Sequence, residues 1–324
     1  MKSKNTAKSK LVLIYRIRLG LCCINTILRV QKTPVFCSRT VIRKNFTLAK
    51  AQSLALQNVE DLSKMISWNE QNGISLFRIS SGLFPHFTDR ELPPYVIDFA
   101  RDGLRRAGNL AKKFGHRVLM HPGQYNQVGT PRENVFQSTI DDLAHHADIL
   151  DAMGVGSGGV IIVHGGGTFG DKGATKKRWA ERFKKLPLKV QKRLVLENCE
   201  KGYSPRDCLD ICHQIKIPMV YDCFHYECYK ILHPDETHDD FDDFIPEVLE
   251  TWEKSELREA AIPLMHVSEQ GEGKTGHHSD FIENIPYHML EIPDKYDVDL
   301  DIEVEAKMKE QAIFRLYEKY GNFK

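Results

Sequence analysis

Two patterns of apolar residues alternate along the chain. Short runs rich in β-branched and apolar residues are followed by longer segments in which apolar residues recur every three or four positions. The short runs are typical of buried strands, and the longer spacing is that of a helix with one apolar face. The predicted strands are Tyr15–Cys23, Ile74–Ser80, His116–His121, Gly159–His164, Arg193–Asn198, Ile217–Asp222, Ile262–Val267 and Val298–Val304.

Helical spacing fills the segments between these strands. The predicted helices are Thr47–Gln71, Pro94–Phe114, Glu133–Met153, Lys176–Lys185, Pro205–Gln214, Phe241–Ser255, Asp280–Leu290 and Lys307–Tyr320. Strands that alternate with helices indicate parallel βα units, and eight such units in about 300 residues match a closed barrel in number and size. We therefore predict an α/β protein with a (β/α)8 TIM barrel, and a doubly wound open sheet is the structural alternative.

Composition excludes several classes of protein. With 41% hydrophobic and 27% charged residues among 324, the chain is neither disordered nor fibrous. No apolar run approaches the ~18–20 residues of a membrane helix, and no secretory signal follows the lysine-rich start. The eight cysteines form no C-x-x-C pair, so we expect reduced thiols in an intracellular protein with no membrane partner.

Charge is unevenly distributed along the chain. Residues 1–59 carry twelve Lys and Arg and no Asp or Glu, whereas the remainder holds 33 basic and 44 acidic residues, a balance of −11. The formal net charge of +1 is therefore the sum of a basic N-terminal part and an acidic body. We expect residues 1–14 to be a basic, flexible extension and residues 15–324 to form a single barrel domain.

Three glycine-rich stretches look like motifs of other enzymes but lack the required context. Gly154–Gly159 spells G-x-G-x-x-G, yet it precedes a predicted strand instead of opening a helix. Gly271–Thr275 (GEGKT) lacks the earlier glycine of a phosphate loop. His164–Gly167 (HGGG) is accompanied by no G-x-S-x-G nucleophile motif. We therefore expect no nucleotide cofactor.

Candidate chemistry gathers where the predicted strands end. Six successive strands end on or beside a His, Asp or Glu, and the C-terminal ends of barrel strands converge on one face. Burying several such groups together without counter-charge is costly, and divalent metals supply that charge while using the free lone pairs. The pattern predicts a polynuclear metal site, with Glu197 as the central candidate for a bridging ligand. The residues are His121, His164, Glu197, Asp222 with His225, His266, and Glu303 or Glu305.

The types of ligand limit which metal ions suit the site, but they are compatible with two kinds of reaction. Mixed His and carboxylate ligation suits Mn²⁺, Zn²⁺, Fe²⁺ or Co²⁺ and disfavours Ca²⁺ and pure Mg²⁺ sites. Groups of two or three metals are the usual machinery for phosphoester hydrolysis. Metal-dependent sugar isomerases also place His, Glu and Asp at strand ends, so from these residues alone an isomerase is the nearest enzymatic alternative.

Nine motifs, in order along the chain, resemble those of the UV damage endonucleases, a family related to endonuclease IV. They are RLGLCCIN (Arg18–Asn25), LFRISSGLFP (Leu76–Pro85), MHPGQYN (Met120–Asn126), HGGGTFGDKG (His164–Gly173), LENCEKGY (Leu196–Tyr203), DCFH (Asp222–His225), HVS (His266–Ser268), HHSDFI (His277–Ile282) and EAKMKE (Glu305–Glu310). The resemblance implies a (β/α)8 barrel that initiates excision repair. Such an enzyme hydrolyses the phosphodiester 5′ to UV photoproducts, both cyclobutane dimers and 6-4 photoproducts, using three divalent metals, commonly Mn²⁺.

The resemblance also divides eight ligands among the three metals. The sets are His121, His164 and Glu197 for the first, Glu197, Asp222, His266 and Glu305 for the second, and His225 with His278 for the third. Glu197, His164 and Asp222 are the expected catalytic residues. The inclusion of His278, and the choice of Glu305 over Glu303, rest on the resemblance alone.

Damaged double-stranded DNA is the partner that the resemblance implies, and the protein is expected to be a monomer. Gln124 and Tyr125 follow His121 closely, and in the family this pair inserts into the duplex and probes the damaged dinucleotide. Lys172, on a glycine-rich loop, is an expected phosphate contact. Asn25 is a further expected DNA or lesion contact because it lies on a family motif near the same rim.

Four positions depart from the family pattern. Leu264 stands where the family usually has a lysine two residues before the His of strand seven, and in some members that lysine is chemically modified near the metals. Leu21, Asp89 and Cys199 replace a tyrosine, a histidine and an acid, respectively. Leu264 motivates a second alternative, a lesion-binding protein that no longer cleaves. The protein is expected to work in whichever compartment holds the genome it repairs.

Overall fold

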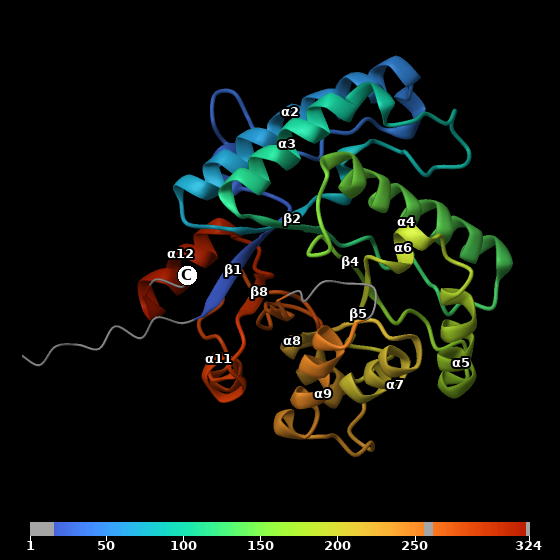
Figure 1. Ribbon diagram of the computed structural model, residues 1–324, viewed down its shortest axis with the longest axis vertical. Coiled ribbons are helices and arrows are strands. Elements are labelled where there is room, and N and C mark those ends of the chain that lie inside the picture. The colour runs from blue at the N-terminus through green and yellow to red at the C-terminus, as the bar shows by residue number, and fades with distance from the viewer. Residues whose placement is uncertain (1–15, 256–261, 322–324) are drawn as a thin grey trace, which may run out of the picture.

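Eight parallel strands close into a barrel in the computed structural model, which describes residues 16–255 and 262–321 (Figure 1). The strands are β1 Ile17–Cys22, β2 Leu76–Ile79, β3 Arg117–Met120, β4 Ile161–His164, β5 Leu194–Glu197, β6 Met219–Asp222, β7 Leu264–Val267 and β8 Leu300–Val304. They follow chain order around the barrel, and β1 pairs in parallel with both β2 and β8. The predicted TIM barrel is confirmed and the open sheet is wrong. The predicted extension over residues 1–14 lies outside the described residues, as does Tyr15.

Helices between the strands form the outer layer of the barrel. They are α1 Thr26–Arg29, α2 Leu48–Gln71, α3 Arg101–Phe114, α4 Glu133–Met153, α5 Lys172–Phe183, α6 Leu188–Gln191, α7 Pro205–Ile215, α8 Cys223–Leu232, α9 Phe241–Glu253, α10 Tyr287–Leu290, α11 Ile292–Tyr296 and α12 Glu310–Tyr320. Figure 1 shows α2 and α3 side by side along one flank, and α12 packs near β1, so the first and last elements meet. Within the described ranges, no helix combines the length and apolarity that a membrane crossing requires.

One predicted helix begins later than its apolar spacing indicates. The segment predicted as Pro94–Phe114 becomes regular α-helix only at Arg101, after a short 3-10 helix over Asp98–Ala100. Tyr95 is buried and its hydroxyl donates to the carbonyl of Pro85, so tertiary contacts hold this stretch against the preceding loop.

A second predicted helix, Asp280–Leu290, is wrong over its first half. The amides of Glu283 and Asn284 donate to one carboxylate oxygen of Glu269, at 3.0 and 2.9 Å. Pro286 has no N–H to continue a helical ladder. Regular structure therefore begins only at Tyr287, in the short helix α10.

Alternate residues of each strand point into the barrel, and these inward side chains form three layers. Arg18 and Arg117 both bind the fully buried carboxylate of Asp301 at the N-terminal mouth. The middle layer is apolar, and its members include Leu76, Leu119, Ile162, Val195, Val220 and Leu264. Two residues further along the same strands come His164, Glu197, Asp222 and His266. The apolar layer thus forms the floor beneath the ring of predicted ligands, and Leu264 is part of it.

Close packing of α3 against α4 depends on a glycine. A Cβ atom built on Gly108 would lie 1.8 Å from the carbonyl oxygen of Met153, the last residue of α4. The chain then turns at Gly154, whose φ of +70° ends α4 in the left-handed conformation. The G-x-G-x-x-G stretch is therefore the end of a helix and a turn before β4, as the sequence indicates.

We predict that Gly108→Ala lowers the free energy of unfolding by about 1–3 kcal/mol, because the new methyl group must push two backbones apart. An alanine would otherwise stabilise a helix interior slightly. Urea unfolding measures the difference. Gly156→Ala is the control, because nothing lies within 4 Å of its Cβ position. An unchanged midpoint for Gly108→Ala would contradict the close approach of the two helices.

Candidate active site

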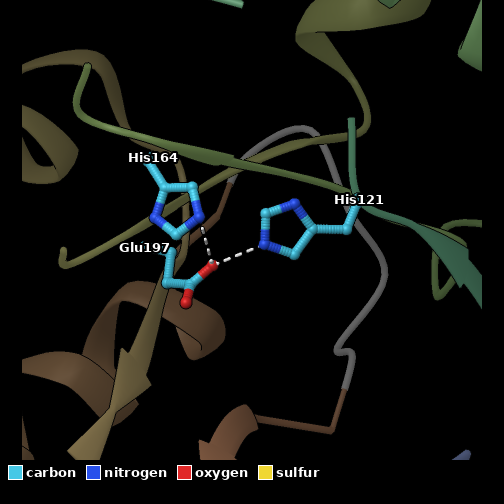
Figure 2. A group of neighbouring side chains, drawn as sticks. All are labelled: His121, His164 and Glu197. Carbon is cyan, nitrogen blue, oxygen red and sulfur yellow. Dashed lines mark hydrogen bonds and ion pairs between the residues drawn. The ribbon is translucent and has the colours of Figure 1, made fainter. Parts of the chain in front are cut away.

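Glu197 lies at the centre of the C-terminal end of the barrel. Its side chain, at the last position of β5, is completely buried. One carboxylate oxygen, Oε2, lies 2.8 Å from Nε2 of His121 and 3.8 Å from Nε2 of His164 (Figure 2). His164 ends β4, and His121 directly follows β3. Neighbouring strands therefore bring these three residues together, as predicted.

The other oxygen of Glu197 faces a second pair of histidines. Oε1 lies 3.1 Å from Nδ1 of His225 and 3.1 Å from Nδ1 of His266. His266 belongs to β7 and is completely buried, and His225 lies in the first turn of α8. One buried carboxylate thus contacts four imidazoles, two on each oxygen. Such an arrangement suits a ligand that bridges two metals.

Asp222 is held in place by its role at the start of α8. Its Oδ1 accepts a hydrogen bond from the amide of His225 at 2.7 Å and caps the helix. Asn198 exchanges two hydrogen bonds of 2.9 Å with the backbone of Asp222. These contacts leave Oδ2 buried without a hydrogen-bond partner, 3.4 Å from Nδ1 of His225. The strand passes into the helix without a loop, which explains why the sequence pattern missed α8.

Glu305 and His278 lie at the β8 side of the site. Glu305 follows β8 and forms an ion pair with the guanidinium of Arg78. Nδ1 of His278 is 3.8 Å from Oε2 of Glu305, and the His278 ring centroid is 6.3 Å from that of His225. All eight predicted ligands therefore lie in one region. How they divide among individual metals stays a prediction.

Electrostatics favour the ligand form of these groups. Burial would raise the pKa of the Glu197 carboxyl, but His164, His266 and His121 hold it well below its usual range. Burial lowers the pKa of His164 to about 4. At neutral pH the carboxylate is therefore charged and this imidazole is neutral, which are the states that bind metals.

The residues fit divalent metal ions on two grounds. Glu197, Asp222, Glu303 and Glu305 are buried together, whereas Arg78 supplies one positive charge among them. Buried atoms also lack hydrogen-bond partners, namely Oδ2 of Asp222 and Nδ1 of His164. Groups with the spacing of metal ligands occur here, and they include His121–His164–Glu197, His121–His266–Glu305 and Glu197–Asp222–His225. These buried clusters could hold metal ions.

The residues predicted to contact DNA differ in exposure and in their hydrogen bonds. Gln124 and Tyr125 are exposed on the loop that follows His121, and 64% of Tyr125 is accessible. Asn25 is completely buried and caps α1 by accepting from the amide of Leu28. Lys172 begins α5 and donates to Asp207 and to the Tyr229 hydroxyl, each at 2.8 Å. Their contacts with DNA stay predictions.

Two residues beside the site make contacts that the sequence did not indicate. Glu303 is completely buried, and its Oε2 lies 2.9 Å from Nε2 of His266. Arg78, on β2, contacts both Glu303 and Glu305. The sequence left Glu303 and Glu305 as alternatives, and the two-residue period of strands places both on the same face as Asp301. No local pattern shows that Arg78 lies beside them, because β2 and β8 are close in the barrel but far apart in the sequence.

At least two solved structures share this fold. The crystal structure of SacUVDE superposes with a TM-score of 0.79 at 28% identity, covering 94% of this chain and 98% of that one. Endonuclease IV from Thermus thermophilus gives 0.54 at 13% identity over 94% of this chain and 98% of that one. The second similarity concerns the fold alone.

Sequence relatives come from a virus, a fungus and a bacterium. A putative UV-damage endonuclease of Acanthamoeba polyphaga mimivirus is 37% identical, covering 94% of this chain and 91% of the relative. The UV-damage endonuclease of Schizosaccharomyces pombe is 38% identical over 94% of this chain, but the match spans only 51% of that longer protein. The UV DNA damage endonuclease of Bacillus velezensis is 31% identical, covering 89% and 88% of the two chains.

Residues 17–324 match the family described as UV-endonuclease UvdE. The match covers the whole barrel and every strand that carries a predicted ligand. The chain therefore belongs to the UvdE family of UV-damage DNA endonucleases.

Proposed function

We propose that the protein is a metal-dependent endonuclease that hydrolyses the phosphodiester 5′ to UV photoproducts in double-stranded DNA. The observation that carries this proposal is the contact of both Glu197 oxygens with histidines from four separate elements. A single-metal site needs no such arrangement, whereas a bridging carboxylate does. Both cyclobutane dimers and 6-4 photoproducts are proposed substrates, and the cut initiates excision repair.

Three divalent ions, with Mn²⁺ favoured and Zn²⁺, Co²⁺ or Fe²⁺ possible on ligand chemistry, are the proposed cofactors. Bound at this site, they would supply positive charge to the phosphate and make water acidic enough to act as a nucleophile. His121, His164 and Glu197 would hold the first ion, and Glu197 would connect it to the second. Asp222, His266 and Glu305 would complete the second, and His225 with His278 would hold the third.

Contacts within the protein hold the predicted metal ligands in position. Asp222 is fixed by the cap of α8, so its free oxygen points to the site without sampling other rotamers. Arg78 restrains Glu305 from β2, which is separated from β8 only by β1. The apolar floor that includes Leu264 keeps water out from below, which strengthens electrostatic interactions above it.

DNA would lie across the rim formed by the loops at the C-terminal ends of the strands. The β1–α2 loop is part of this rim, and it exposes Arg29, Lys32 and Lys44. Such groups attract phosphates irrespective of base sequence. Gln124 and Tyr125 are exposed a few residues after a predicted ligand, where they can enter a distorted duplex. A photoproduct already weakens stacking, which lowers the cost of extrusion.

The alternatives from the sequence have less support. A sugar isomerase has less support because residues 17–324 match a family of endonucleases, whereas an L-ribulose 3-epimerase shares only the fold, at 14% identity. A lesion-binding protein without cleavage would need a damaged site, yet all eight predicted ligands lie together.

We propose that the protein acts as a monomer in the compartment that holds the genome it repairs.

We predict that Glu197→Gln reduces nicking of UV-irradiated plasmid by more than about 100-fold, since even partners that only orient a ligand cost 10–100-fold. Bound metal, measured by elemental analysis after dialysis against Mn²⁺, should fall with it. Glu318→Gln, at an exposed position on α12, is the control. Full activity with normal metal content in Glu197→Gln would exclude the bridging assignment.

We predict that Tyr125→Ala weakens binding to a photoproduct duplex about 5–150-fold, the equivalent of one lost base-stacking contact of 1–3 kcal/mol. Metal content and the unfolding midpoint should stay at wild-type values because the side chain is exposed. Fluorescence anisotropy with damaged and undamaged duplexes measures the effect. Tyr287→Ala removes a tyrosine of similar exposure on α10 and serves as a comparison. An equal loss on both duplexes would contradict a role in lesion recognition.

A further inference from the structure

We propose that Glu303 is a positioning residue that orients His266 for metal binding. The inference deepens the proposed function and rests on it, since it concerns how one ligand of that metal centre is held. Glu303 lies on β8 directly beside His266 of β7, with which it is paired in the sheet register. Both side chains are completely buried.

The two nitrogens of His266 face different surroundings. Nδ1 lies 3.1 Å from Oε1 of Glu197, 3.9 Å from Oδ2 of Asp222 and 3.7 Å from Oε1 of Glu305. These carboxylates are the predicted metal ligands. Nε2 points the other way, to Oε2 of Glu303 at 2.9 Å. Nδ1 is therefore the atom available to a metal, and Nε2 is the atom available to a proton.

Glu303 and His266 are each other's nearest available partners. Nε2 of His266 and Oε2 of Glu303 lie 2.9 Å apart, within hydrogen-bond distance, and neither atom has another hydrogen-bond partner. Leaving both buried and unpaired would be costly. A hydrogen bond between them would satisfy both. The proton then sits on Nε2, and the lone pair of Nδ1 is directed at the carboxylates.

Arg78 lies beside both Glu303 and Glu305. Its Nη1 lies 3.4 Å from Oε2 of Glu303 and pairs more closely with Glu305. The guanidinium therefore partly balances the charge of both buried carboxylates. Glu303 also has Cys22 and Glu305 near it, at the spacing of metal ligands. Glu303 is assigned to orient a ligand and not to be one because it contacts Nε2 of His266, whereas the predicted ligands Glu197 and Glu305 face Nδ1.

Carboxylate partners of this kind fix the tautomer of a ligating histidine and raise its basicity, and removing one typically weakens metal binding 10–100-fold. We therefore predict that Glu303→Gln lowers Mn²⁺ affinity 10–100-fold while the number of bound ions stays the same. Glu303→Asp, which keeps the charge, should recover part of the loss. Calorimetric titration of the metal-free protein with MnCl₂ measures affinity and number together.

Asp301→Asn is the matched control. It changes a buried carboxylate on the same strand and the same inward face, two residues away, but at the opposite mouth of the barrel. It should lower the unfolding temperature and leave Mn²⁺ affinity unchanged. The rise in unfolding temperature caused by Mn²⁺ is a second readout, because it depends on affinity for the folded state. That rise should shrink in Glu303→Gln and not in Asp301→Asn.

Three outcomes would overturn the inference, and each differs from the others. Wild-type Mn²⁺ affinity in a folded Glu303→Gln protein would show that Glu303 only balances the charge of Arg78. Loss of a whole bound ion would make Glu303 a ligand itself. Absence of Mn²⁺ binding by the wild-type protein would contradict the proposed function as well. If Glu303→Gln does not fold, the same comparison between Glu303→Asp and wild type decides, with an intermediate loss expected.

Discussion

The contact between the buried Glu197 carboxylate and four imidazoles is the interaction on which the rest of the site depends. Each histidine comes from a different element, namely β4, β7, α8 or the segment that directly follows β3. Only a closed barrel brings these elements around one point. The carboxylate in turn needs the histidines, because without a compensating positive charge its burial would be too costly. Fold and site therefore determine each other at the C-terminal end of the barrel.

Much of this architecture follows from local sequence patterns. Each strand of the barrel lies within a predicted range. The strand ends alone indicated six of the eight predicted ligands and left Glu303 and Glu305 as alternatives for a seventh. Buried parallel strands have strong apolar runs, and a polar residue at the end of such a run stands out. The position of His278 needed the family resemblance because the segment around it has no regular structure, and its backbone is held by Glu269 and by residues after β8.

What could not be predicted depends on contacts between distant segments. The start of α8 is hidden because Asp222 ends a strand and caps a helix at once. Arg78 on β2 meets Glu303 and Glu305, more than two hundred positions later in the chain, because closure of the barrel places β8 on the other side of β1. The sequence predicts that Asn25 contacts DNA at the rim of the barrel, whereas its side chain is buried and caps the short helix α1. In each case the tertiary partner, which no window of sequence contains, decides the role.

The uneven charge along the sequence corresponds to an uneven distribution of charge in the structure. The basic N-terminal part continues from β1 into the loop at the rim, where Arg29, Lys32 and Lys44 are exposed. Arg39 and Arg43 on the same loop are instead paired with Asp61, Asp89 and Glu91. Part of the acidic excess is buried at the site, where bound divalent ions would neutralise it. With those ions bound, the rim proposed to meet DNA would be more positive than the net charge of +1 indicates.

The most direct test of this account is incision of an end-labelled duplex that carries one defined cyclobutane dimer, with Mn²⁺ or with EDTA. We predict a single cut at the phosphodiester immediately 5′ to the dimer, dependent on Mn²⁺ and absent from the undamaged duplex. Tight binding of the dimer without any cut in the presence of Mn²⁺, or a cut that persists in EDTA, would contradict it.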